Sequence, residues 1–159
     1  MEIDIASFLK RYTGFIPEET FMDILRKQLN GESSCSITED AYNETLKKLQ
    51  EYKLWNTELS EVSYYQNLGM DYERKNDLEN AVKSYEKAIT LGEESPRIKI
   101  NNYLHSVERL AIVYRKLKRY DDEVRVILIG LKYQDVNPSD NYYVRLRKRL
   151  AKAESLLNK

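Results

Sequence analysis

The sequence predicts an all-α protein, and three observations carry that prediction. Apolar side chains recur at intervals of three and four residues through most of the 159-residue chain, which is the spacing of one helix face. Only five glycines and three prolines interrupt the pattern, which favours long helices joined by short connections. We found no segment that alternates apolar and polar residues in the period of two that is typical of a strand. We therefore expect helices that pack on other helices.

The N-terminal part, residues 1–60, is expected to be a helical region of its own. A first short helix is predicted within 6–16 and ends near Gly14. Pro17 then opens a second helix over 17–31, with acidic residues in its first turns and basic residues later, as the helix dipole favours.

A loop and a third helix complete this region in the prediction. The stretch GESSCS, residues 31–36, has the most loop-like composition in the chain. Ser36 with Glu39 predicts a capping box, and the helix that it starts is expected to end near Trp55. We place the boundary between the two regions near Glu58.

The second region, residues 61–159, predicts five helices. Asn76-Asp77 and Asn137-Pro138 are turn signals that separate some of them. The apolar run VRVILIGL, residues 124–131, fits a strand or a buried helix, and its flanking residues favour the helix. The expected helices are 61–75, 78–91, 96–117, 120–134 and 140–157.

The second region also contains an internal repeat with a period of 42 residues. Small residues recur where two helices must approach closely, and large residues recur where a neighbouring helix needs filling. This pattern predicts helix hairpins stacked in register, and we expect the matching positions to be core residues. The matches are Leu68 with Leu110, Gly69 with Ala111, Tyr72 with Tyr114, Leu78 with Tyr120, Val82 with Val124, Tyr85 with Ile127, and Ala88 with Gly130.

These positions resemble the tetratricopeptide repeat family, whose pattern is W-x₂-L-G-x₂-Y, then A-x₃-F, then a small residue. The first copy consists of Tyr65, Leu68, Gly69, Tyr72, Ala81, Tyr85 and Ala88, and the second of Val107, Leu110, Ala111, Tyr114, Glu123, Ile127 and Gly130. Glu123 departs from the pattern, because a small residue is expected there. The period also exceeds the family's usual 34 residues, so we expect about two extra helical turns after Ser95-Pro96 and before Val107.

The resemblance implies a right-handed α-α superhelix of helix hairpins with a C-terminal capping helix. Its repeats would occupy about 61–95 and 96–137, and the closing helix 140–157. Such arrays usually need about three units for stability, so the first 60 residues or a second copy of the chain are expected to complete the stack.

Composition limits the class of protein further. The formal net charge is zero, but residues 1–60 carry 7 basic and 11 acidic residues, whereas 141–159 carry 6 basic and 1 acidic. An acidic front and a basic tail could meet a partner, each other, or another copy of the chain. No run of 18 apolar residues is present and the first residues lack a basic signal-like start, so no membrane association is expected. A single cysteine predicts a reducing, cytoplasmic location.

Catalysis has little support in the sequence. His105 is the sole histidine, Cys35 is the sole cysteine, and no nucleotide-binding or metalloprotease motif is present. We therefore expect no enzyme, no cofactor and no metal site. A hydrolase that depends on Cys35 is the weakest of three functional hypotheses.

The resemblance instead implies a protein-binding groove lined by the first helix of each hairpin. The leading hypothesis is a cytoplasmic adaptor that binds a peptide or a helix of another protein. The family's variant that grips a terminal carboxylate is not expected, because its lysine and asparagine positions are not matched. The expected groove residues are Gln66, Met70, Glu73, Arg74, His105, Glu108, Ile112, Arg115 and Lys116.

The basic helix 140–157 supports the remaining hypotheses. Arg145, Arg149 and Lys152 could extend the groove or contact phosphates, so a nucleic-acid-associated regulator is the alternative from a different class. This helix could instead contact the acidic N-terminal region, either within one chain or between two chains, and the second case would produce a homo-oligomer.

Overall fold

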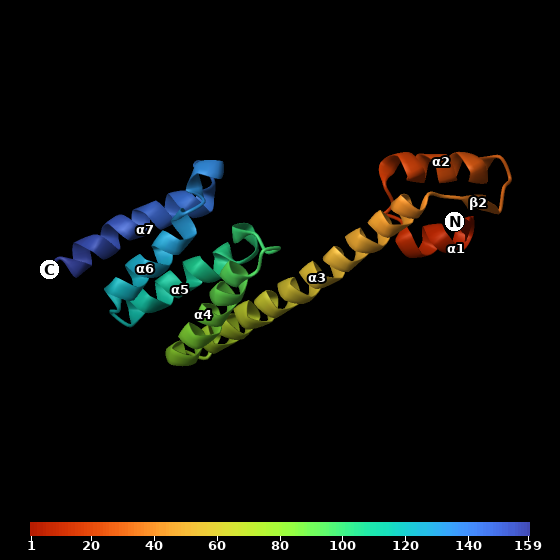
Figure 1. The fold of residues 1–159 in the computed structure, drawn as a ribbon. Helices are drawn as coiled ribbons and strands as arrows, with labels where there is room; N and C mark the ends of the chain where they lie inside the picture. Colours follow the sequence, from red (N-terminus) through yellow and green to blue (C-terminus); the bar gives the residue numbers. More distant parts are fainter. The chain divides into compact units, whose positions relative to one another are not determined.

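The computed structural model describes the backbone of Met1–Lys159 and every side chain except that of Val136. The chain divides into two compact units, Met1–Trp55 and Asn56–Lys159. Helices dominate both units, which confirms the all-α class (Figure 1).

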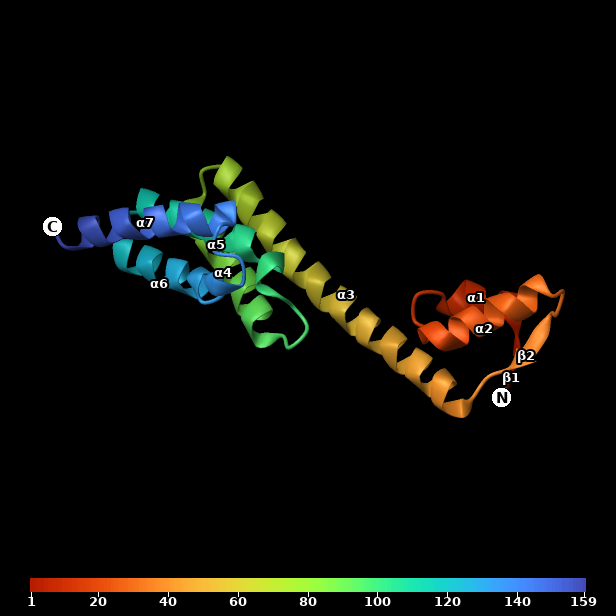
Figure 2. The same ribbon diagram turned by 90° about the horizontal axis from the view of Figure 1, so that it is seen from above.

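The first unit contains two helices and a small strand pair. Helix α1 (Ile5–Tyr12) and helix α2 (Glu18–Leu29) accompany strands β1 (Glu2–Asp4) and β2 (Ser34–Ser36), which pair antiparallel (Figure 2). The strands are a correction, because the sequence predicted a loop over 31–36. Each strand has only three residues, with one buried residue between two exposed ones, so its period of two is too short to stand out.

Side chains from all four elements form the core of this unit. Ile3 and Cys35 lie opposite each other on the strand pair and both point into the core. Partly buried side chains from the N-terminal half of the next helix cover it. The buried residues are Ile3, Ile5, Phe8, Tyr12, Ile16, Ile24, Cys35 and Ile37.

Helix α3 (Glu39–Arg74) is a single helix of 36 residues, so the break expected near Glu58 is absent from this described segment. The segment contains no proline, its glutamates favour a helix, and its asparagine and threonine residues are only modestly unfavourable in one. The predicted cap is also wrong: the hydroxyl of Thr38, not that of Ser36, accepts the N–H of Ala41 at 3.0 Å.

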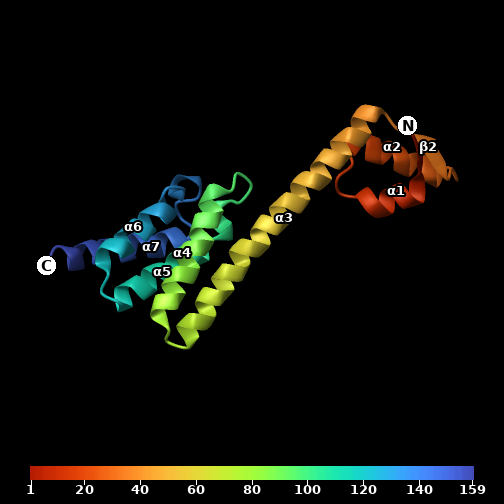
Figure 3. The same cartoon turned by 60° about the horizontal axis from the view of Figure 1, so that its bottom comes forward.

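The second unit consists of the C-terminal part of α3 and four further helices. They are α4 (Leu78–Glu94), α5 (Leu104–Lys116), α6 (Tyr120–Leu131) and α7 (Asn141–Leu157). Each helix packs against its successor as an antiparallel neighbour, which gives the expected succession of hairpins (Figure 3). The right-handed twist of the array stays a prediction.

The helix expected at 96–117 begins eight residues late, at Leu104. The Ser95 hydroxyl accepts the N–H groups of Arg97 and Ile98, and a 3₁₀ turn over Ile100–Asn102 follows. Ile98 is buried, so the segment is anchored as an ordered loop. The residues between the two hairpins therefore lie in this loop and do not lengthen the helix by two turns.

The two hairpins share the same turn, 42 residues apart. Asn76 and Lys118 both have positive φ, 58° and 60°. In each turn the next N–H bonds back to a tyrosine carbonyl at 2.9 Å, from Asp77 to Tyr72 and from Arg119 to Tyr114. This pattern is a Schellman-type helix end, in which glycine is the preferred residue at the left-handed position.

We expect Lys118→Gly to raise the free energy of unfolding by about 1 kcal/mol, because a residue with a Cβ is strained at this φ. Urea unfolding followed by far-UV circular dichroism measures the change. Lys116→Gly, two residues earlier and inside α5, is the matched control and should destabilise the protein by a similar amount. A loss of stability in Lys118→Gly would contradict the strain.

Candidate functional site

One layer of the second unit is formed by the C-terminal part of α3, α5 and α7, which polar contacts hold side by side. The Ser106 hydroxyl of α5 donates to the Gln66 side-chain oxygen of α3 at 2.8 Å. The His105 Nδ1, also of α5, lies 3.3 Å from the Tyr142 hydroxyl of α7. We call this layer the α3–α5–α7 face, and it carries two hollows.

The first hollow, of about 280 Å³, lies between α3 and α5. Its lining residues are Met70, Glu73, Arg74, His105 and Arg109. Glu73 is its charged centre: the Arg109 guanidinium donates two hydrogen bonds to it, one of them 3.0 Å long from Nε, and the Tyr85 hydroxyl donates a third at 2.8 Å.

These contacts set the charge of Glu73. Burial alone would raise the pKa of its carboxyl, but the hydrogen bonds from Arg109 and Tyr85 outweigh burial and hold the pKa below its usual 4.5. Burial and the neighbouring Glu73 carboxylate raise the pKa of Tyr85. The Tyr85 hydroxyl therefore remains a donor, and the carboxylate remains charged at neutral pH.

The lowered pKa of Glu73 predicts a contribution to stability that depends on pH. The contribution is fully present above the unfolded value of about 4.5 and is lost as the pH falls through the lower folded value. We expect Glu73→Gln to lose stability at pH 7 and to approach the wild type as the pH falls below 4.5. Urea unfolding at a series of pH values measures both. A constant gap between the two proteins down to the lowest pH would contradict this role of Glu73.

The second hollow, of about 350 Å³, lies between α5 and α7. Its lining residues are Glu108, Ile112, Arg115, Arg145, Lys148 and Arg149. Arg145 donates to both oxygens of Glu108, at 2.8 and 3.3 Å, and so joins the two helices across the hollow. Ile112 is the one apolar residue among those that line it.

A buried carboxylate lies next to this second hollow. Glu123 of α6 has no solvent exposure, and it accepts from Arg115 of α5 at 2.9 Å and from Arg149 of α7 at 3.3 Å. Arg115 also donates to the backbone carbonyl of Arg149 at 2.9 Å. One acidic side chain therefore holds three helices together.

Comparison with known proteins identifies part of this unit. A family model described as tetratricopeptide repeat matches residues 62–93, which comprise the end of α3 and most of α4. Residues 62–93 are a tetratricopeptide repeat. No curated protein and no solved structure matches the chain. Repeats of this family are in general non-catalytic modules of protein–protein interaction.

The first helix of the tetratricopeptide repeat supplies several of the predicted groove residues. The structure brings Met70, Glu73, Arg74 and His105 together around the first hollow, and Glu108, Ile112, Arg115, Arg145 and Arg149 around the second. Gln66 is held by Ser106. Lys116 and Lys152 are exposed and line neither hollow.

Many of these charges form ion pairs within the second unit. Glu73, Glu108, Arg115, Arg145 and Arg149 all form ion pairs with residues of another helix. The pairing of Arg145 and Arg149 with carboxylates lowers the positive charge that α7 offers to a phosphate. Replacing these two arginines by glutamate would test folding before it tested binding.

Sequence reasoning missed Arg109 and Lys148, which line the two hollows. The position of Arg109 could have been found from its distance along the sequence to an acidic residue. Glu73 pairs with Arg109 and Glu108 pairs with Arg145, which are separations of 36 and 37 residues. Acidic and basic residues about one repeat apart therefore mark contacts between successive first helices.

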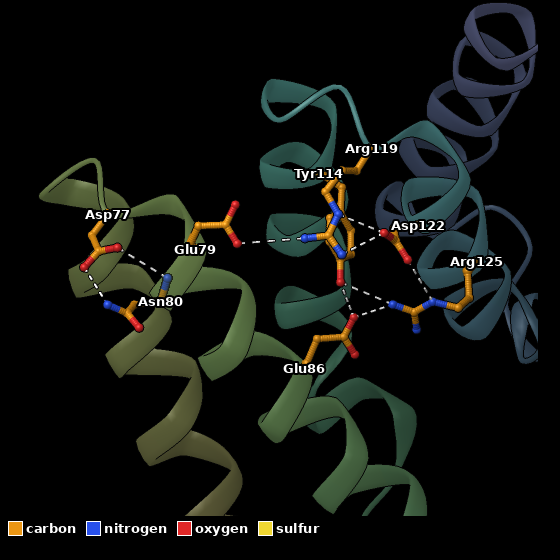
Figure 4. A network of polar contacts seen from close by, with 8 residues as sticks. All are labelled: Asp77, Glu79, Asn80, Glu86, Tyr114, Arg119, Asp122 and Arg125. Atoms are coloured by element: carbon orange, nitrogen blue, oxygen red, sulfur yellow. Dashed lines mark hydrogen bonds and ion pairs between the residues drawn. The ribbon is translucent and has the colours of Figure 1, made fainter.

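The second helices of the hairpins, α4 and α6, are tied in a comparable way through α5. The Tyr114 hydroxyl and the Arg125 guanidinium both donate to Glu86 (Figure 4). Arg119 lies 4.8 Å above the Tyr114 ring and pairs with Asp122 at 2.8 Å. Charged residues of α4 and α6, the layer opposite the α3–α5–α7 face, are therefore engaged in contacts within the unit.

A larger cavity, of about 740 Å³, lies outside the predicted groove, where α4, the loop after it and the start of α7 meet. Tyrosine is the commonest residue type around it. Burial raises the pKa of Tyr103 to about 12, so its hydroxyl stays protonated. The tyrosines are Tyr103, Tyr133, Tyr142 and Tyr143.

Cys35, the residue considered for a hydrolase, lies in a hydrophobic core. Cys35 is buried in the core of the first unit, and burial raises the pKa of its thiol, whereas a nucleophilic cysteine needs a lowered pKa. Among the side chains that the structure describes, no three histidine, cysteine or acidic residues gather as a metal site. Within the same residues, no helix has the length and apolar character needed to cross a bilayer.

Proposed function

We propose that the chain is a non-catalytic adaptor that binds a peptide or a helix of another protein on the α3–α5–α7 face. The observation that carries the proposal is the first hollow, because the first helix of the tetratricopeptide repeat at 62–93 contributes Met70, Glu73 and Arg74 to it. The second hollow, on the next two helices of the same layer, extends the surface. A peptide that crosses α5 would reach both hollows.

The proposal includes the organisation of the chain. We propose a second tetratricopeptide repeat at about 96–137, supported by its recurring turn at Lys118, with 140–157 as the closing helix. The N-terminal region, about 1–60, would then lie outside the repeats. A lone, buried free thiol is compatible with a reducing compartment, and we propose the cytoplasm.

Site-specific photo-cross-linking tests where a partner binds. We expect a photoreactive residue at position 112 of the full chain to capture one discrete protein in an extract of the source organism. The same residue at position 128 is the matched control, because Leu128 is also apolar, is 50% exposed and lies on α6 in the other layer. Capture at 112 and not at 128 supports the proposal. Capture at 128 alone, or equally at both positions, would contradict it.

Light scattering decides whether the partner is a second copy. We expect the same mass at low and high salt, since Arg145 and Arg149 of α7 are paired with carboxylates of their own chain. A dimer that dissociates in high salt would contradict the adaptor function and would indicate self-assembly through charged surfaces.

A further inference from the structure

We infer that the second hollow receives an aspartate or glutamate side chain of the partner, next to an apolar residue. The inference rests on the proposed function and specifies the chemistry of the partner. It assigns a binding role to Lys148, which no contact within the described part of the chain explains.

The charges around the second hollow do not balance. Four cationic side chains line or bound it: Arg115, Arg145, Lys148 and Arg149. Two carboxylates face them, Glu108 in the lining and Glu123 directly behind it. The cluster therefore carries an excess of two positive charges, although the whole chain is neutral.

The excess results from two features. Arg115 and Arg149 share the single carboxylate of Glu123, so two guanidiniums are matched by one negative charge. Lys148 is exposed and has no hydrogen-bond or ion-pair partner among the side chains that the structure describes. An added carboxylate would lower the excess from two positive charges to one without displacing an existing pair.

The positions of these groups favour a carboxylate. Arg115 and Arg149 are only 28% and 25% exposed and are fixed by hydrogen bonds, so they lose little conformational freedom on binding. A guanidinium offers more donors than Glu123 occupies, and carboxylates match that geometry. Ile112 offers an apolar contact beside the charges, which suits an acidic residue followed or preceded by leucine.

The neighbouring lysines extend the positive potential beyond the hollow. Lys152 lies four residues after Lys148 on α7, so both are on one side of that helix. Lys116 is exposed at the end of α5. Further acidic residues of the same peptide would be attracted along this edge and would increase the rate of association.

Fluorescence anisotropy with two labelled peptides tests the inference on the full chain. The probe is a short peptide of glutamate, leucine and serine, and its counterpart has glutamine in place of every glutamate. We expect the glutamate peptide to bind about tenfold more tightly at low salt, and the difference to shrink as salt rises.

Variants of the hollow locate the effect. Lys148→Glu should weaken the binding of the glutamate peptide by about fivefold and leave the affinity for the glutamine peptide unchanged. Lys83→Glu is the matched control, because Lys83 is an exposed lysine on α4, and it should change the binding of neither peptide. Thermal unfolding of each variant confirms that the fold is retained, which is expected because both lysines are exposed.

Each outcome decides between the inference and the proposed function. Equal binding of the two peptides would overturn the acidic preference and leave peptide binding intact. No binding of either peptide would also overturn the inference, while cross-linking at position 112 decides the adaptor function separately. Displacement of the glutamate peptide by a short duplex DNA at lower concentration would overturn it in favour of a phosphate-binding surface.

Discussion

Glu123→Ala is expected to lower the free energy of unfolding by about 3 kcal/mol, the largest effect of any single change on the polar contacts described above. The carboxylate has no solvent exposure and pairs with Arg115 and Arg149. Its removal leaves two guanidiniums close together without a counter-charge, which costs about 3–5 kcal/mol for a buried pair. Because both arginines retain some access to water, we expect the lower end of that range.

Urea unfolding gives the size of this effect, and hydrogen exchange locates it. Exchange should increase in α5, α6 and α7 and remain unchanged in the first unit. Asp121→Ala is the matched control, because Asp121 is an exposed acid in the same turn of α6 and should cost less than about 1 kcal/mol. A cost below about 1 kcal/mol for Glu123→Ala would contradict the bridging role of the carboxylate.

Gly69→Ala is expected to destabilise the second unit by about 2 kcal/mol, although alanine is the better helix former. A Cβ at Gly69 would lie 2.7 Å from the Tyr85 ring, and the ring cannot move easily because it is buried and its hydroxyl is bound to Glu73. Overpacking of this kind costs about 1–3 kcal/mol, and it exceeds the gain of about 1 kcal/mol in helix propensity.

The second hairpin supplies the matched test for Gly69. The equivalent positions there are Ala111 and Ile127, so a methyl group is combined with a smaller neighbour. We expect Gly69→Ala in a Tyr85→Ile background to cost at least about 1 kcal/mol less than Gly69→Ala alone, measured by a double-mutant cycle in urea. Additive effects would show that the methyl group and the ring do not compete for space.

The hairpins of the second unit were predictable from the sequence because their cores are dense and regular. Among the matching positions of the repeat, the structure buries Tyr85, Ala88, Leu110, Ala111 and Tyr114, as predicted. It leaves other matching positions only partly buried, namely Leu68, Tyr72, Leu78, Tyr120 and Val124. Small and large residues at helix-packing positions are constrained by close approach, and such constraints leave a strong pattern.

Other parts of the fold were not predictable, because weak local signals decide them. The continuation of α3 past Glu58 is favoured by Glu58, Leu59 and Glu61, which are good helix formers, although Asn56 and Ser60 beside them suggested a boundary. The loop before α5 depends on Ser95, whose position suggested a helix cap but whose hydroxyl forms a tight turn around buried Ile98. The departure at Glu123 is explained only by arginines on two other helices.

The sequence indicated which residues share the α3–α5–α7 face, but not which of their charges are paired. A repeat places residues such as Met70 and Ile112 on the first helices, so their gathering on one face follows from the pattern. The repeat pattern does not show which charged side chains are unpaired, because Arg145 and Arg149 pair with residues 37 and 26 positions away in the sequence. The apparent basic face of α7 therefore reduces to a smaller set that includes Lys148.

Chemical-shift mapping of the full chain with the glutamate peptide tests the central claim most directly, namely that a partner binds on the α3–α5–α7 face. We predict that shifts cluster on residues of α5 and α7 around the second hollow, with Ile112 and Lys148 among the largest, and extend to Met70 at higher peptide concentration. Shifts that cluster on α4 and α6, or within the first unit, would contradict the claim.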